Sequence, residues 1–244
     1  MKSRQEIKQQ AKQRIAKDNL WLALGLPFLV FTLVDLAFAF NDSLKGVSSA
    51  IYGLTLLYEL CTSLYLFDIL MKQQSAAKSL GDKLSDMLGS LTAQSFKVAL
   101  LVGFIVGLWF FLPYAVGIGF IIAALIYNSF GLIFWFGVIL LFGGGFVGLV
   151  KIYEYALAIY LAKTNEELGL FALLKESKQK MKGHKWTLFV QNLSFFWWVL
   201  GVFATGGLLG FYVIPYVLAA NTIFATEVLG IPTSDKAEKD LEVF

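Results

Sequence analysis

Six long apolar runs constrain the fold of this chain more than any other feature of its sequence. They extend from Leu20 to Phe40, Ala50 to Met71, Phe96 to Ile126, Phe130 to Ala162, Trp186 to Ala204 and Gly206 to Leu229. Runs of ~18 or more apolar residues are typical of transmembrane helices. Only 15% of the residues are charged, whereas a soluble domain has ~25%. The sequence therefore predicts an all-α, polytopic membrane helix bundle with about six transmembrane helices.

The first run also has a feature of a signal peptide, since Ala37-Phe38-Ala39 matches the small-residue pattern of a cleavage site. Against cleavage, the basic leader is long and Asp35 lies inside a run of transmembrane length. We expect an uncleaved first transmembrane helix.

Residues 1–19 are a basic segment with the spacing of a helix, on which Ile7, Ala11 and Ile15 form a thin apolar stripe. A solvated basic helix close to anionic lipid headgroups fits this pattern. Nucleic-acid binding is the alternative, but the segment has neither interleaved aromatic residues nor a known motif. We therefore expect membrane lipids, and no nucleic acid, as its partner.

Lysine and arginine are distributed unequally between the connections. The leader and the 163–185 loop have six each, the 72–95 loop three and the 230–244 tail two, whereas the intervening connections have one in total, Lys45. Cytoplasmic loops are enriched in these residues. The sequence thus predicts a single transmembrane domain over residues 20–229 in the plasma (cytoplasmic) membrane, with cytoplasmic loops 72–95 and 163–185 and with both termini cytoplasmic.

Both cytoplasmic loops have amphipathic patterns. Within the 76–95 stretch one helical face is apolar, which favours an interfacial helix, although a partner-docking helix would have the same pattern. In the second loop, Thr164-Asn165-Glu166-Glu167 matches a capping box and Gly183 suits a C-cap. The expected membrane-interface anchors are Trp21, Lys182, His184, Lys185 and Trp186.

The third and fourth runs are longer than a bilayer requires. A straight helix over the 31 residues of the third run would measure ~46 Å, against a hydrocarbon core of ~30 Å. We expect breaks at Pro113 and at Gly143, Gly144 and Gly145. Such breaks either line a binding site or allow close helix packing, and the spacing of Gly144 and Gly148 favours packing.

Charged residues inside the runs provide the candidate intramembrane polar site. Glu59 lies near the middle of the second run, Lys151 and Glu154 are three residues apart near the end of the fourth, and Asp35 lies in the first. Charges inside a membrane are costly and commonly functional. We expect Lys151 and Glu154 to neutralise each other, and Glu59 and this pair to face the bundle interior.

Catalytic and metal-binding motifs are not found in the sequence. One cysteine, Cys61, and one histidine, His184, are too few for a cysteine or multi-histidine metal site. The sequence contains no P-loop, no HExxH and no GxSxG pattern. We therefore expect no catalytic residues, no metal, no cofactor and no enzymatic activity.

The second half of the chain resembles a known family. The residues concerned are Lys175-Glu176-Ser177, Met181 to Trp186, Phe189, Leu193-Ser194-Phe195, Trp198, Gly207 and Pro215-Tyr216, together with Leu20 to Ala23 after the leader. They resemble the domain-of-unknown-function 975 family, uncharacterised multi-pass membrane proteins mostly of Gram-positive bacteria. Where this resemblance leads us to expect a Pro-Gly pair, the chain has Gly143-Gly144-Gly145. The resemblance implies a membrane location and six spans, but no activity.

Two classes of function remain open. The first is a non-catalytic accessory or scaffold protein that binds lipids, a partner membrane protein or a second copy of itself. The second is a transporter or channel for a small solute or peptide. Many transporters contain internal repeats, and the two halves of this chain show none that is convincing.

Overall fold

The computed structural model describes residues 2–16, 19–39, 45–72, 79–128 and 130–231, and every regular element in these ranges is a helix. The chain divides into two compact units, Met1–Thr92 with Trp186–Phe244, and Ala93–Lys185. The predicted tail beyond residue 231 and residues 73–78 of the predicted 72–95 loop lie outside the described residues. The single transmembrane domain over residues 20–229 stays a prediction.

Within the described ranges, five stretches of helix are long and apolar enough to cross a membrane. They are α2 (Leu20–Ala39), α3 (Lys45–Lys72), α5 (Ala93–Ile126), α6 (Leu132–Glu154) continued by α7 (Ala158–Thr164), and α11 (Gly210–Leu229). The pair α9 (Lys185–Leu193) and α10 (Phe196–Ala204) makes a sixth if the two are counted as one bent span. The all-α membrane bundle expected from the apolar runs is confirmed.

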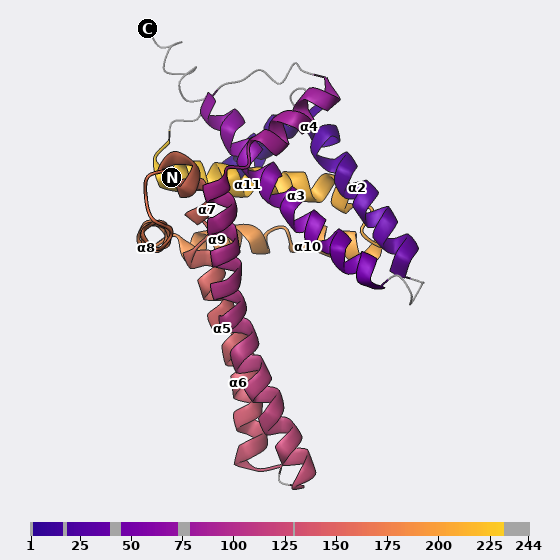
Figure 1. The fold of residues 1–244 in the computed structure, drawn as a ribbon, viewed down its shortest axis with the longest axis vertical. Helices are drawn as coiled ribbons and strands as arrows, with labels where there is room; N and C mark the ends of the chain where they lie inside the picture. Colours follow the sequence, from indigo (N-terminus) through magenta and orange to yellow (C-terminus); the bar gives the residue numbers. More distant parts are fainter. Residues whose placement is uncertain (1, 17–18, 40–44, 73–78, 129, 232–244) are drawn as a thin grey trace. The chain divides into compact units, whose positions relative to one another are not determined.

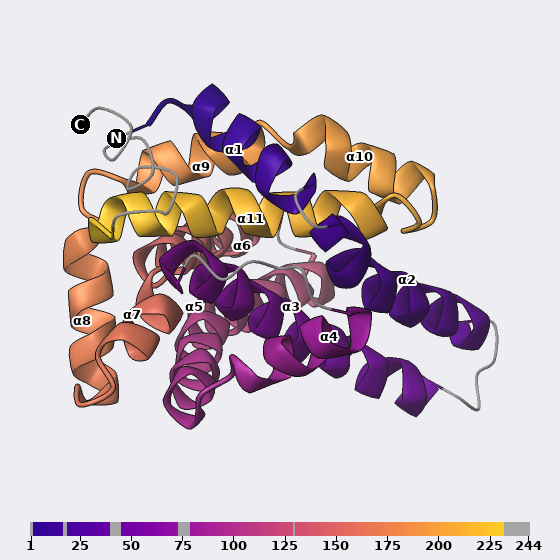
Figure 2. The ribbon, with the colours of Figure 1, turned by 90° about the horizontal axis from the view of Figure 1, so that it is seen from above.

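The first unit is built around α11, which packs against α1 (Arg4–Ala16), α2, α3 and α10 (Figure 2). Small residues allow α2 and α11 to approach closely. A Cβ atom on Gly25 would collide with the backbone carbonyl of Phe211, and one on Gly210 with the ring of Phe28. Helices surrounded by lipid have no hydrophobic driving force for association. The van der Waals contact that such a close approach allows stabilises the helix pair instead.

The leader helix α1 is packed on protein along its apolar stripe. Ile7 and Ala11 are fully buried and Ile15 is 1% exposed, because α1 lies against α11. The apolar stripe, for which the sequence indicated no partner surface, is therefore used inside the unit, and the basic residues Arg4 and Lys12 remain on the exposed side. The sequence identified the helix and its stripe correctly but not the surface that covers the stripe.

The second amphipathic helix, α4 (Leu80–Gly89), also docks within the first unit. Ser79 is its N-cap, with its hydroxyl accepting from the backbone N–H of Asp82. Met87 is 2% exposed, and the Ser90 hydroxyl after the helix donates to the Cys61 carbonyl of α3. The apolar face of α4 is thus partly covered by α3.

The second unit is a long antiparallel hairpin of α5 and α6, which lie side by side along their length (Figure 1), with α7 and α8 (Leu170–Lys180) packed at its base. Glycines set the distance between α5 and α6. A Cβ on Gly117 would lie 2.8 Å from the Gly137 carbonyl oxygen, and one on Gly137 equally close to that of Gly117. Gly144 faces the ring of Pro113, and Gly148 faces the ring of Phe110.

The breaks predicted in the third and fourth runs are wrong. Helix α5 continues through Pro113, and α6 continues through Gly143, Gly144 and Gly145. Gly144 instead provides the space that Pro113 occupies on the neighbouring helix. The length argument failed because a long helix can be accommodated by tilting or by extending past the hydrocarbon. The preference for packing over a binding site agrees with the contacts of Gly144 and Gly148.

The fifth run, expected to be a single transmembrane helix, is bent. Helices α9 and α10 are bent by 41° relative to each other, with Ser194 and Phe195 between them. The Ser194 hydroxyl donates to the Gln191 carbonyl three residues earlier. Hydroxyl groups that bond back to the helix backbone often bend helices.

Candidate functional site

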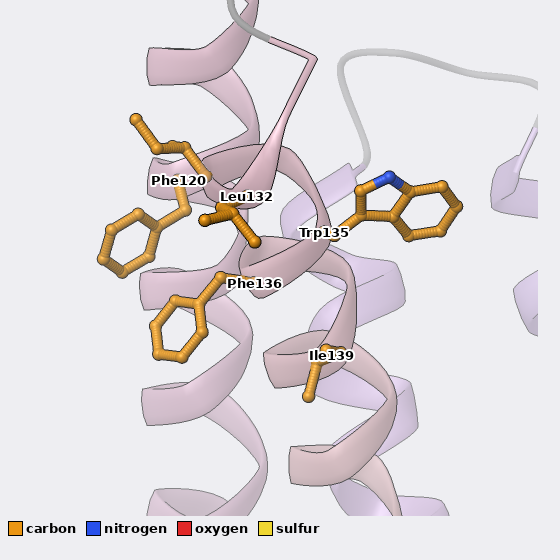
Figure 3. A pocket seen from close by; sticks show the side chains of 6 residues that line it. Phe120, Leu132, Trp135, Phe136 and Ile139 are labelled. Atoms are coloured by element: carbon orange, nitrogen blue, oxygen red, sulfur yellow. The ribbon is translucent and has the colours of Figure 1, made fainter.

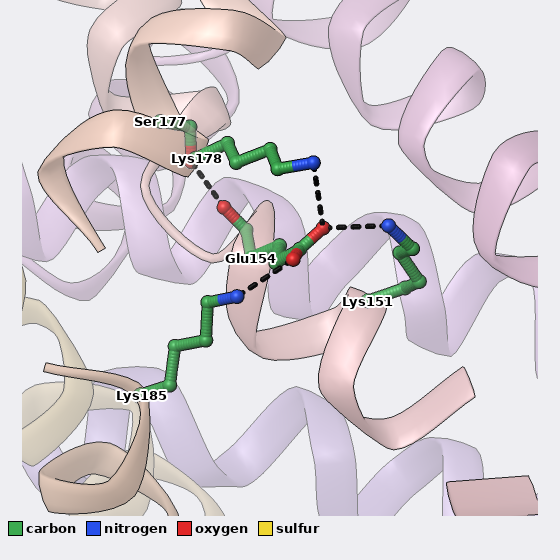
Figure 4. A network of polar contacts seen from close by, with 5 residues as sticks. All are labelled: Lys151, Glu154, Ser177, Lys178 and Lys185. Atoms are coloured by element: carbon green, nitrogen blue, oxygen red, sulfur yellow. Dashed lines mark hydrogen bonds and ion pairs between the residues drawn. The ribbon is translucent and has the colours of Figure 1, made fainter. Parts of the chain in front are cut away.

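Glu154 lies within ion-pair distance of three lysines in the described part of the chain. Its Oε2 lies 2.8 Å from Lys151 Nζ and 3.9 Å from Lys178 Nζ, and its Oε1 lies 2.6 Å from Lys185 Nζ (Figure 4). All four residues belong to the second unit. We call them the Glu154 cluster. One buried carboxylate thus gathers three ammonium groups.

Neighbouring groups fix the cluster in place. The fully buried Ser177 hydroxyl donates to the Glu154 backbone carbonyl over 3.0 Å, which ties α8 to the end of α6. The ammonium group of Lys151 also lies 5.3 Å from the centre of the Trp109 ring on α5, within the range of a cation–π contact. The Glu154 side chain is 8% exposed, whereas that of Lys178 is 50% exposed.

The ends of the helices bring these residues together. Helix α6 ends at Glu154, and the chain turns at 155–157 before α7. The predicted capping box at Thr164 is wrong, because Thr164 is the last residue of α7 and its hydroxyl donates back to the carbonyls of Tyr160 and Leu161. Helix α8 begins later, with Gly169 as its N-cap.

The C-terminal end of α8 also differs slightly from the expectation. Its C-cap is Met181, and Gly183 lies two residues beyond with a φ of +82°. A left-handed backbone conformation favours glycine, so Gly183 provides the turn that returns the chain to Lys185 at the start of α9.

The structure brings together only part of the predicted polar site. Lys151 and Glu154 form the expected ion pair. Glu59 and Asp35 belong to the first unit, where Glu59 is half-buried in α3 and Asp35 is exposed on α2. Among the described residues neither carboxylate has an ion-pair partner. Their role as site residues stays a prediction.

The expected interface anchors have different surroundings. Trp186 is 72% exposed and Lys182 is exposed, while His184 is half-buried. Trp21 packs edge-on against Phe211 of α11 at 5.3 Å between ring centres. Lys185 is held by Glu154, so it has a partner in the protein. Sequence reasoning missed Lys185 and Lys178 as partners of Glu154, since nothing in their spacing links α8 or the start of α9 to α6.

A second contact that the sequence did not indicate lies at the bend between α9 and α10. Lys8 Nζ on α1 donates to the Ser194 carbonyl over 3.0 Å and lies 4.3 Å from the centre of the Phe195 ring. Burial, and to a smaller extent the charge of Arg4, lowers the pKa of Lys8. A carbonyl near a helix bend thereby gains a charged donor.

Near the loop that joins α5 and α6, a surface pocket of about 460 Å³ opens on the hairpin (Figure 3). Its lining is almost entirely apolar: Phe120, Leu132, Ile133, Trp135, Phe136 and Ile139. These side chains can contact an acyl chain or an apolar helix but provide no group for acid–base or nucleophilic chemistry. Among the described residues no three His, Cys, Asp or Glu side chains are grouped so that they could hold a metal ion.

Comparison with known proteins identifies a family. The model of the family "Protein of unknown function (DUF975)" matches residues 1–230. No curated protein and no solved structure matches the chain. The matched region contains every helix of both units, including α6, α8 and α9, which carry the Glu154 cluster. The family model therefore covers nearly the whole chain, and the protein belongs to the DUF975 family.

Proposed function

We propose that this protein is a non-catalytic accessory or scaffold protein of the plasma membrane, with both termini in the cytoplasm, that binds lipids or a partner membrane protein. The observation that carries the proposal is the exposed α5–α6 hairpin. In the most apolar stretch of α5 only 6% of the residues are buried, and in that of α6 with α7 17%, against 56% in both α3 and α11.

The hairpin exposes bulky side chains rather than a smooth aliphatic surface. Phe111 is 73% exposed, Phe142 77% and Phe146 69%. Because its small residues Gly117, Gly137 and Gly144 are used between α5 and α6, the outer faces are left to contact lipid chains or another apolar helix. A scaffold of this kind would bind through its apolar surface and would need no reacting group.

The proposed orientation rests on the lysine and arginine distribution. Two contacts in the first unit agree with this orientation. Lys2 pairs with Glu227 at 2.8 Å, and the Arg14 guanidinium donates to the Ile69 carbonyl over 3.1 Å. These contacts gather the leader and the C-terminal ends of α3 and α11, all expected on the cytoplasmic side. Cysteine labelling from outside intact cells should reach position 45 and not position 2.

The test of the scaffold proposal is crosslinking in native membranes. A photoreactive residue at Phe142 should capture lipid or a partner protein, and a partner should remain in stoichiometric amounts after mild extraction. The variant Phe142→Ala/Phe146→Ala should weaken that association. The matched control is Trp197→Ala/Phe203→Ala, which removes exposed aromatic residues (79% and 78% exposed) from α10. Equal effects of both variants, or turnover of a lipid substrate by the purified protein, would contradict the proposal.

A transporter or channel is the second candidate, and the bend between α9 and α10 favours it. Interrupted helices in transporters often provide backbone groups for ions or substrates, and Glu59 is a half-buried carboxylate in an apolar helix. If this candidate is right, the protein alone in liposomes should conduct proton-coupled flux, and Glu59→Gln should abolish it. The control Asp35→Asn changes an exposed carboxylate and should leave flux intact. Absence of flux would remove this candidate.

A further inference from the structure

We propose that Lys151, Lys178 and Lys185, gathered around Glu154, bind a phosphate group, and that this group belongs to the headgroup of an anionic lipid. The inference deepens the proposed function, because it rests on lipid binding and names the class of lipid and the residues that select it.

The geometry places three ammonium groups close together. Lys151 Nζ and Lys178 Nζ both approach Glu154 Oε2, at 2.8 and 3.9 Å, so their separation is no larger than the sum of these distances. Lys185 Nζ lies 2.6 Å from Oε1 of the same carboxylate. Since each ammonium carries three N–H donors, the lysines keep donors for a further acceptor after each has bonded to Glu154.

The charges of the cluster do not balance. One carboxylate against three ammonium groups leaves two positive charges, and the nearest acidic side chain along α8, that of Glu176, is paired with Lys180 at 3.7 Å. The C-terminal carbonyls of α6 provide only a partial negative charge. Like charges held together are unfavourable, and a phosphate group compensates them while accepting hydrogen bonds through its oxygens.

The lysines are also open to a ligand. The side chains of Lys151, Lys185 and Lys178 are 18%, 31% and 50% exposed. Lys178 combines the highest exposure with the longest distance to Glu154, so its ammonium group has the most freedom to bond a phosphate oxygen. Glu154 and Lys151 form the inner part of the site, and Lys178 forms its entrance (Figure 4).

An exposed apolar side chain on the face of α8 that carries Lys178 favours a lipid over a free anion. Phe171 is 74% exposed and lies seven residues before Lys178 on α8, so both point to the same side of the helix. An exposed aromatic residue about two turns from a lysine on the same helix face is typical of helices that lie in the membrane interface, with the ring in the acyl boundary and the charge at the headgroups. A free phosphate would make no use of Phe171.

Anionic lipid could also bind through general attraction to the basic loops, without any specific site. A pair of variants distinguishes this general attraction from binding at the Glu154 cluster. Lys178→Gln and Lys182→Gln remove the same charge from neighbouring exposed positions, but only Lys178 approaches Glu154 within 4 Å. Lysines near an anionic surface each contribute similarly to general attraction. Therefore, only a specific site at the Glu154 cluster predicts a larger loss of lipid binding for Lys178→Gln than for Lys182→Gln.

The experiment measures binding of fluorescent phosphatidylglycerol and phosphatidylcholine to the full-length protein in mild detergent, with inorganic phosphate as a separate probe. The wild type should prefer phosphatidylglycerol. Lys178→Gln should weaken that binding by more than the about five-fold loss that general attraction assigns to one lysine near an anionic surface, and Lys178→Arg should restore it. Lys182→Gln and Phe171→Ala serve as further variants, and far-UV circular dichroism confirms that all are folded.

Each result has a defined meaning. Loss at position 178 and not at 182, with weaker binding by Phe171→Ala, supports the lipid site. Equal binding of inorganic phosphate and the lipid, with no effect of Phe171→Ala, overturns the lipid assignment and leaves a free-anion site. Equal losses for the two lysine variants, or no preference for phosphatidylglycerol, overturn the site. In that case partner capture by the α5–α6 hairpin still tests the proposed function independently.

Discussion

Replacing Gly144 with alanine should destabilise the α5–α6 hairpin, whereas the same replacement at Gly143 or Gly145 should stabilise it. A Cβ on Gly144 would lie 3.0 Å from Pro113 Cγ and closer still to Pro113 Cβ, while nothing lies within 4 Å of a Cβ on either neighbour. The proline ring is rigid and attached to the backbone of α5, so it has no flexible end that can move aside.

The expected size follows from two effects. Overpacking costs about 1–3 kcal/mol, and the rigidity of Pro113 places Gly144→Ala near the upper end of this range. Alanine is also favoured over glycine inside a helix by about 1 kcal/mol, at all three positions. The net change is thus a loss of about 2 kcal/mol at position 144 and a gain of about 1 kcal/mol at positions 143 and 145, so the difference of about 3 kcal/mol reports the clash alone.

The assay is the free energy of unfolding in mixed micelles, titrated with a denaturing detergent and followed by circular dichroism. A double-mutant cycle adds specificity, because Gly144→Ala should cost less in a Pro113→Gly background if the two side chains collide. Were the three glycines a flexible break, all three alanine variants would have similar effects. Equal shifts at positions 143, 144 and 145, or no coupling with position 113, would refute the packing argument.

Three other variants test contacts in the first unit. Tyr58→Phe removes a hydroxyl that donates to the Leu24 carbonyl over 2.7 Å and should cost about 1 kcal/mol of unfolding free energy, whereas Tyr52→Phe, at a 67% exposed position, should cost almost nothing. Lys8→Met should loosen α1 from the α9–α10 bend, and faster amide exchange of α1 than in an Arg4→Met control would show this; equal exchange rates would mean that the Lys8 contact is unimportant. Ser3 and Glu6 form a capping box in which the Ser3 N–H donates to Glu6 Oε2 over 2.6 Å and the Glu6 N–H donates to Ser3 Oγ, and these bonds lower the pKa of Glu6 from its ordinary value of 4.5. Because the pKa is lower in the folded state, the contribution of Glu6 to helix stability is complete above pH 4.5 and is lost as the pH falls through the lowered pKa. An NMR titration should therefore give a Glu6 midpoint below 4.5, and Ser3→Ala should raise it part of the way because the backbone N–H remains; a midpoint unchanged by Ser3→Ala would exclude the hydroxyl as a cause.

The sequence alone determined the fold class, because apolar runs of membrane length follow from composition and require no knowledge of contacts. It also located the leader helix with its Ile7, Ala11 and Ile15 stripe, the helix at Leu80–Gly89, and the Lys151–Glu154 pair, since each depends on residues within two turns of one another. The capping boxes show the limit of such patterns: the one at Thr164 does not start a helix, whereas Ser3 and Glu6, which the sequence reading passed over, form one.

Tertiary structure decided everything that depends on a neighbouring helix. Proline and consecutive glycines have the local chemistry of a break, but Gly144 faces Pro113 across the hairpin, so both helices remain continuous. The run from Trp186 to Ala204 has no proline, and its bend lies where Lys8 of a distant helix reaches the Ser194 carbonyl. From the sequence, Lys178 is an ordinary cytoplasmic lysine and Lys185 an interface anchor, and only the meeting of α6, α8 and the start of α9 makes both of them partners of Glu154. Helix formation in lipid is set by the residues of each segment, which must bond their own backbone groups internally, whereas contacts across long sequence separations are set by packing and leave no periodic signal in the chain.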